Sequence, residues 1–175
     1  MSRAARFGPL ALLLLVIVAL VWRLATPSNT EVASKLEGKP VPAFDLAAAL
    51  PSKPTISTAE LATGRPRLVN IFASWCVPCI SEVKVLQELK RRGVAIDGIA
   101  IRDRSQDIAD FLARNGDPYE RIGSDPQSLV QISLGSSGVP ESFIVDGKGV
   151  IRYQHVGPIE ASDVPLILSK IEEAK

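Results

Sequence analysis

The two cysteines of the chain, Cys76 and Cys79, are the side chains best suited to do chemistry. They follow an apolar run at 68–72 that predicts a buried strand. Apolar residues at spacings of three come next and predict a helix over 76–92. On such a strand-to-helix turn, free backbone N–H groups and the helix dipole favour a thiolate at Cys76. Cys79, one turn further along, can close a disulfide with it, and the pattern predicts dithiol redox chemistry.

The cysteine pair has three other possible uses. A structural disulfide between residues three apart closes a very short loop, so it would stabilise the fold little. A closed zinc site needs four ligands, whereas the sequence offers only one histidine, His155, besides the two cysteines. A copper site stays open, although such sites usually recruit methionine, and the only methionine is Met1.

The first 25 residues have the pattern of a membrane-insertion signal. The run 7–22 has no charged residue, and Arg3, Arg6 and Arg23 flank it. We predict a single-pass signal anchor over 7–25, with residues 1–6 in the cytoplasm because the positive charge is on their side. A cleaved secretory signal is the alternative, but residues 22–26 lack a small-x-small cleavage site. Residues 26–40 are polar and rich in turn formers, which predicts a linker.

The remaining residues, 41–175, have the length of one ordinary domain. Beyond residue 25 the chain carries 17 Lys and Arg against 19 Asp and Glu, which gives no basic patch for nucleic acid. Strands over 67–73 and 95–101 alternate with helices over 76–92 and from 105 or 107 to 115, which indicates a parallel βαβ unit and an α/β fold. A hairpin over 142–153 and a last helix over 161–173 should complete the sheet.

Four motifs in this order resemble the thioredoxin fold and, more narrowly, the membrane-anchored DsbE or CcmG type of thiol:disulfide interchange protein. The motifs are Val69-Asn70-Ile71-Phe72-Ala73-Ser74-Trp75-Cys76-Val77-Pro78-Cys79, Gly116-Asp117-Pro118-Tyr119, Gly138-Val139-Pro140-Glu141-Ser142-Phe143 and His155-Val156-Gly157-Pro158.

The resemblance implies a set of site residues around the cysteine pair. Pro140 should be cis and face the pair, so that the backbone of Val139 is presented to an extended substrate. Trp75 should lie at the rim of the site. Glu82 and Glu141 match the family's active-site carboxylates, and a carboxylate near Cys79 could take its proton.

The sequence departs from related proteins at three places. Asn70 stands where thioredoxin has a buried aspartate, which shifts the handling of protons to the two glutamates. Residues 83–84 lack a proline that relatives often have, and the loop 132–137 lacks an aromatic residue, which weakens any inference about substrate preference.

The function that the resemblance implies is reduction of disulfides in apocytochrome c, or in a maturation-complex thiol protein that handles it, during cytochrome c maturation. The enzyme would be anchored in the inner membrane with its domain in the periplasm, and a membrane thiol donor of the DsbD or CcdA type would re-reduce it. No cofactor or metal is expected, because the two sulfurs carry the electrons. Alternatives are an anchored thioredoxin for oxidase assembly or another exported substrate, a copper-binding assembly factor, and a general disulfide-forming oxidant.

Overall fold

The computed structural model describes residues 3–25 and 36–175, which divide into two compact units, 1–32 and 33–175. In the first unit, α1 (Arg3–Ala25) is a helix of 23 residues with Pro9 inside it. Among the described residues, no helix is both long enough and apolar enough to cross a membrane. The anchor predicted at 7–25 therefore stays a prediction. Of the linker predicted at 26–40, residues 26–35 lie outside the described residues.

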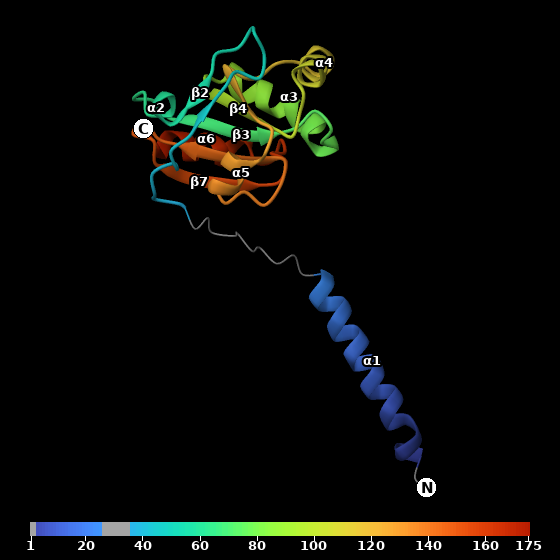
Figure 1. The fold of residues 1–175 in the computed structure, drawn as a ribbon. Coiled ribbons are helices and arrows are strands. Elements are labelled where there is room, and N and C mark those ends of the chain that lie inside the picture. The colour runs from blue at the N-terminus through green and yellow to red at the C-terminus, as the bar shows by residue number, and fades with distance from the viewer. Residues whose placement is uncertain (1–2, 26–35) are drawn as a thin grey trace. The chain divides into compact units, whose positions relative to one another are not determined.

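A five-stranded sheet forms the centre of the second unit (Figure 1). Its strand order is β5-β4-β3-β6-β7. β3 and β5 both run parallel to β4, whereas β6 is antiparallel to β3 and β7 is antiparallel to β6. Every residue of β3, β4 and β6 is buried, as expected for strands covered on both faces. The strand bounds are β3 Arg67–Phe72, β4 Ala95–Ile101, β5 Arg121–Asp125, β6 Glu141–Val145 and β7 Ile151–Val156.

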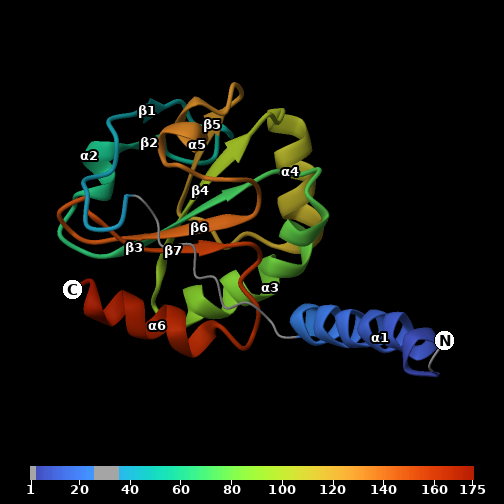
Figure 2. The same cartoon turned by 90° about the horizontal axis from the view of Figure 1, so that it is seen from below.

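Helices and a small hairpin cover the two faces of this sheet. α3 (Val77–Arg91) packs against both α4 (Ser105–Asn115) and α6 (Val164–Glu173). Figure 2 shows α3 and α6 below the sheet, and α2 (Thr58–Leu61), α5 (Leu129–Ser133) and the β1–β2 hairpin on its other side. That hairpin pairs Asp45–Leu46 with Ile56–Ser57 and packs against β5.

The segment just before residue 41 belongs to the folded unit. Gly38 donates its N–H to Ile151 O at 2.8 Å, Ile151 donates to Lys39 O at 3.0 Å, and Pro40 pairs with Val150. These contacts tie the segment to the start of β7. The folded unit thus includes residues 36–40, which we had expected in the linker.

The α/β architecture and the parallel βαβ unit are confirmed, whereas the sequence pattern predicts neither β5 nor α5. β5 has no apolar run in its sequence, Arg-Ile-Gly-Ser-Asp, yet it pairs with β4 along its whole length. α5 has only five residues. Both are too short or too polar to give a periodic signal, and they form because the neighbouring strand and loops cover them.

Candidate active site

Cys76 and Cys79 form a disulfide at the junction of β3 and α3. Cys76 is the N-cap of α3, and the N–H of Cys79 donates to Cys76 Sγ at 3.2 Å. Pro78 lies in the first turn of the helix, where it leaves no acceptor unsatisfied. The predicted position of the pair at a helix N-terminus is confirmed, and the same N–H and the helix dipole favour a thiolate at Cys76 after reduction.

The disulfide is buried, while the residues on either side of Cys76 are not. Cys76 and Cys79 are 4% and 2% exposed, whereas Trp75 is 55% and Val77 74% exposed. A partner thiol therefore meets an apolar rim before it reaches the sulfurs. Trp75 lies at this rim, as the resemblance implied.

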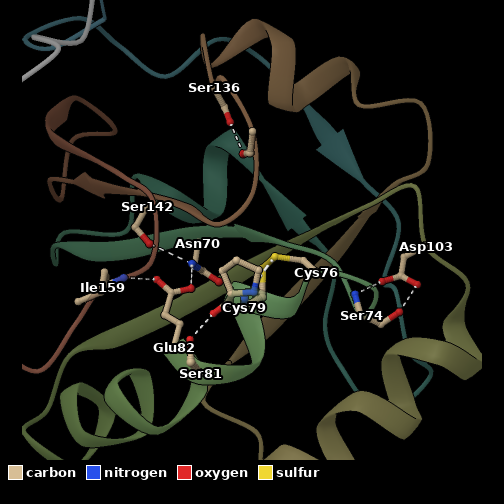
Figure 3. The surroundings of a disulfide bond; sticks show 12 residues. Asn70, Ser74, Cys76, Cys79, Ser81, Glu82, Asp103, Ser136, Ser142 and Ile159 are labelled. Atoms are coloured by element: carbon tan, nitrogen blue, oxygen red, sulfur yellow. Dashed lines mark hydrogen bonds between the residues drawn. A yellow bond between two sulfur atoms is a disulfide. The ribbon is translucent and has the colours of Figure 1, made fainter. Parts of the chain in front are cut away.

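The loop before Cys76 is held by the turn between β4 and α4. Ser74 donates its N–H and its hydroxyl to the two carboxylate oxygens of Asp103, at 2.6 and 2.8 Å (Figure 3). The Trp75 indole N–H donates to Arg102 O at 3.2 Å. Sequence analysis missed Ser74 and Asp103, because nothing in the spacing of 29 residues indicates that they meet.

The peptide bond between Val139 and Pro140 is cis, as the resemblance implied. Pro140 is buried and immediately precedes β6. Because Glu141 pairs with Ile71 in antiparallel register, Val139 and Pro140 lie at the end of β3 that leads to the cysteines. The cis peptide and the disulfide therefore share one end of the sheet.

Glu82 lies one turn beyond Cys79 on α3, at 1% exposure. Ile159 donates its N–H to Glu82 Oε1 at 3.0 Å, and the Asn70 side-chain amide donates to Oε2 at 3.2 Å. Burial raises the pKa of Glu82 to about 7, and the two hydrogen bonds partly oppose this rise. A carboxylate with a pKa near neutrality, on the helix face of Cys79, is suited to accept a thiol proton.

A buried polar network surrounds Glu82 on the α3 side of the sheet (Figure 3). The Asn70 amide nitrogen also donates to Ser142 Oγ at 3.0 Å, and the Tyr119 hydroxyl donates to Asn70 Oδ1 at 2.8 Å. Asn70, Ser142 and Tyr119 are each at most 2% exposed. Sequence analysis placed Asn70 at the site but missed Ser142 and Tyr119 as partners, because they come from distant parts of the chain.

Glu141 is also buried, but it faces the other side of the sheet. Successive strand residues point to opposite faces, and its neighbour Ser142 points toward Asn70 and Glu82. Glu141 Oε2 accepts from Ser136 Oγ at 2.9 Å and from the Ser137 N–H at 2.8 Å, and Gln154 donates to Oε1. The structure thus brings Glu82, but not Glu141, to the polar network, and a role for Glu141 in proton transfer stays a prediction.

A cavity of about 500 Å³ lies beside the exposed Trp75. Its wall is charged but balanced, with three arginines and three aspartates. The lining residues are Ser74, Trp75, Arg102, Asp103, Arg104, Asp107, Asp110 and Arg114. Within the described part of the chain, no group of three or more His, Cys, Asp or Glu side chains is arranged to hold a metal ion.

Comparison with known proteins gives the same picture of fold and chemistry. The Redoxin family model matches residues 36–170. The thiol:disulfide interchange protein DsbE of Pseudomonas fluorescens biotype C is 40% identical over 160 residues, or 91% of this chain and 88% of that protein. DsbE of Escherichia coli (strain K12) is 36% identical over 166 residues, which are again 91% of this chain and 88% of that protein.

A crystal structure of a thiol:disulfide interchange protein of the thioredoxin family from Chlorobium tepidum TLS superposes on this chain with a TM-score of 0.61. It is 25% identical and covers 77% of this chain and 94% of its own. The thioredoxin-like fold is confirmed.

Proposed function

Because the chain belongs to the DsbE (CcmG) family of thiol:disulfide interchange proteins, we propose that this thiol-disulfide oxidoreductase works as a reductase in cytochrome c maturation. Its substrate would be a disulfide in apocytochrome c or in a maturation-complex thiol protein that handles it. The observation that carries this proposal is the buried cysteine pair at the start of α3 with Glu82 one turn behind it.

The reaction follows from this arrangement. In the reduced enzyme the Cys76 thiolate attacks one sulfur of the substrate disulfide, the substrate S–S bond breaks, and its other sulfur leaves as a thiolate. The Cys79 thiol gives its proton to the Glu82 carboxylate and attacks Cys76 Sγ. The mixed disulfide then breaks, the substrate leaves with both sulfurs reduced, and the Cys76–Cys79 disulfide has formed. Two electrons have passed to the substrate.

The substrate would meet the enzyme at the end of the sheet where Trp75, Val139 and Pro140 lie. Exposed Trp75 and Val77 offer an apolar surface for an extended chain. Each turnover leaves the Cys76–Cys79 pair oxidised. A membrane thiol donor of the DsbD or CcdA type would therefore re-reduce the enzyme.

We also propose that residues 7–25 anchor the protein in the inner membrane, with residues 1–6 in the cytoplasm and the folded unit in the periplasm. The uncharged run and the arginines on its N-terminal side support this orientation. An oxidising compartment is also where a dedicated reductase of disulfides would be needed.

Trapping of mixed disulfides in cells tests the function. A Cys79→Ser variant lacks the resolving thiol, so it should accumulate adducts through Cys76 that contain apocytochrome c or its handling protein, and these adducts should be recovered with the membrane fraction. Cys76→Ser, the matched control, should trap nothing and should not support cytochrome c assembly. Assembly of holocytochrome c by Cys76→Ser would contradict the proposal.

The reduction potential of the purified chain, measured against a dithiol buffer, separates a reductase from an oxidant. We expect a value nearer to about −270 mV, as in thioredoxin, than to about −120 mV, as in the oxidant DsbA. A value near the oxidant's would mean that the pair donates disulfides, and the assignment to cytochrome c maturation would be abandoned.

A further inference from the structure

The segment Gly116-Asp117-Pro118-Tyr119 places a buried phenol next to the active-site network. Gly116 has φ +100°, and a Cβ there would lie 1.8 Å from Gln87 Nε2 of α3, so the chain approaches α3 closely at this point. Asp117 accepts the Tyr119 N–H at 3.0 Å and forms an ion pair with Lys53 at 2.6 Å. The backbone that carries Tyr119 is therefore held from several sides.

The Tyr119 ring packs closely against β4 because Gly98 has no side chain at this point. A Cβ on Gly98 would lie 3.1 Å from Tyr119 Cδ1 and 2.8 Å from Phe72 Cε1. The ring stacks on Phe72 with a centroid separation of 4.7 Å. Gly98 pairs with Asn70, so the phenol passes over β4 and its hydroxyl reaches Asn70 Oδ1 on β3.

This contact decides which way the Asn70 amide points. With the Tyr119 hydroxyl donating to Oδ1, the amide nitrogen uses its two hydrogens on Glu82 and Ser142. In the opposite orientation the buried phenol proton would lose its acceptor, and Asn70 Oδ1 would face the Glu82 carboxylate. Both changes cost free energy because Asn70, Glu82 and Tyr119 are buried.

We propose that Tyr119 is a positioning residue of the active site, which holds the Asn70 amide with its nitrogen toward Glu82 and so favours the carboxylate that receives the proton of Cys79. The transfer of the Cys79 proton to Glu82 rests on the proposed function, whereas the effect of Tyr119 on the ionisation of Glu82 does not. A carboxylate that accepts N–H bonds from Asn70 and Ile159 is stabilised in its charged form. Without the tyrosine hydroxyl, Asn70 is free to turn its oxygen to Glu82, which favours the protonated acid.

The other titratable groups around Glu82 lie on several elements. α3 contributes Cys79 itself, and the loop before β5 contributes Tyr119 with Asp117 beyond it. β7 contributes His155, which is the register partner of Ser142. His155 Nε2 lies 3.8 Å from Oδ2 of Asp163, the N-cap of α6. Burial raises the pKa of Tyr119 well above its usual value, and the nearby charges of Glu82 and Asp117 add to this, so Tyr119 remains a hydroxyl donor over the whole working range.

The test is a pH titration of the Glu82 side-chain carboxyl by carbon-13 NMR in the full chain. Tyr119→Phe keeps the ring and removes only the hydroxyl, and we expect it to move the midpoint of the Glu82 titration upward by about one pH unit. Tyr153→Phe, the matched control, removes the hydroxyl of the other tyrosine of the chain, on β7, and should leave the midpoint in place.

A second variant shows whether the effect passes through Asn70. Asn70→Ala removes the donor to Glu82 and should raise the midpoint at least as far as Tyr119→Phe does. Adding Tyr119→Phe to Asn70→Ala should then change nothing further. An unchanged midpoint in Tyr119→Phe, or a full additional shift in the double variant, would overturn the proposal. If Tyr119→Phe does not fold, Asn70→Ala alone decides. A Glu82 midpoint that does not rise in Asn70→Ala would then overturn the proposal.

The rate of disulfide closure separates this inference from the function on which it rests. The probe is the reduced chain reacted with oxidised glutathione, with release of the second glutathione followed between pH 5 and 9. We expect Glu82→Gln to remove the limb of the profile with a midpoint near 7, and Tyr119→Phe to move that limb upward. If Glu82→Gln leaves the profile unchanged, Glu82 does not receive the proton and that part of the proposed function fails. The NMR titration still decides whether Tyr119 sets the ionisation of Glu82.

Discussion

Two buried glutamates with the same exposure have different surroundings in this protein. Glu82 accepts two N–H bonds and has Cys79 one turn away, while Glu141 accepts from Ser136, Ser137 and Gln154 on the opposite face. The Glu141 contacts hold the loop that leads into the cis peptide at Pro140. Residue type alone therefore does not assign a role to a carboxylate, because the strand face on which it lies decides what it meets.

The pKa of Glu82 makes the stability of the fold depend on pH. Its value in the folded state, about 7, exceeds the usual 4.5, so folding favours the neutral carboxyl. That contribution is fully present below about pH 4.5 and is lost as the pH rises through 7. Glutamine at this position is neutral at every pH. The free energy of unfolding of the wild type, minus that of Glu82→Gln, should fall by about 3 kcal/mol between pH 4 and 8.

Urea unfolding of the oxidised full chain across this pH range measures the difference. Groups other than Glu82 titrate in both proteins and cancel in the subtraction. Two stability curves that run parallel from pH 4 to 8 would show that Glu82 has an ordinary pKa.

At the scale of the elements, the packing of β4 against its neighbours prepares the site. Gly98 leaves room for the rings of Phe72 and Tyr119, which stack over β4 on the same side of the sheet as Asn70. α4 closes the layer with Phe111, whose ring centroid lies 5.8 Å from that of Phe72. The aromatic layer and the polar network are thus one packed unit, so a change of volume in the first displaces the second.

Gly98→Ala should therefore lower the free energy of unfolding by about 1–3 kcal/mol, because the added methyl group overpacks the layer. Gly138→Ala is the matched control, since a Cβ at Gly138 meets nothing within 4 Å and its φ is not positive. Denaturant titration of both variants gives the comparison. Equal stability of the two would mean that the ring of Tyr119 moves away without cost.

Over the whole folded unit, redox chemistry and a buried ion pair occupy opposite ends of the strands. The cysteines follow the last residue of β3, whereas Arg67, its first residue, is 1% exposed and bonds to Asp97 of β4 and to Glu120. Asp97 is fully buried, and Arg121 approaches it only at 3.7 Å. Loss of Arg67 would therefore leave a buried carboxylate without a close partner.

We expect Arg67→Met to lower the free energy of unfolding by about 3–5 kcal/mol. Arg65→Met is the control: its guanidinium also bonds to Glu120 but is 58% exposed, and such surface pairs contribute at most about 1 kcal/mol. The reduction potential of folded Arg67→Met should equal that of the wild type, because the cysteines lie at the other end of β3. Similar losses of stability in both variants, or a shifted potential in Arg67→Met, would contradict this separation.

Patterns in the chain were enough to locate the reactive centre and most of its scaffold. The strand before Cys76, the helix after Cys79, the parallel unit, the hairpin and the last helix all have local periodic signals, because each buries an apolar face of its own. The motif around Pro140 indicated the cis peptide through resemblance. The polar β5 and the short α5 gave no such signal, since they depend on neighbours for burial.

Only the tertiary structure shows which polar side chains surround the cysteine pair. Asn70, Tyr119 and Ser142 are separated by up to 72 residues. Their hydrogen bonds form because β3 and β6 are adjacent in the sheet and because the loop before β5 brings Tyr119 over β4 to Asn70. Likewise, the family resemblance implied the same role for Glu82 and Glu141, but strand alternation in β6 turns Glu141 to the other face of the sheet, away from the network that contains Glu82. Local pattern determines which elements form, whereas the pKa of a buried group depends on desolvation and on donors brought from distant segments, which no local pattern contains.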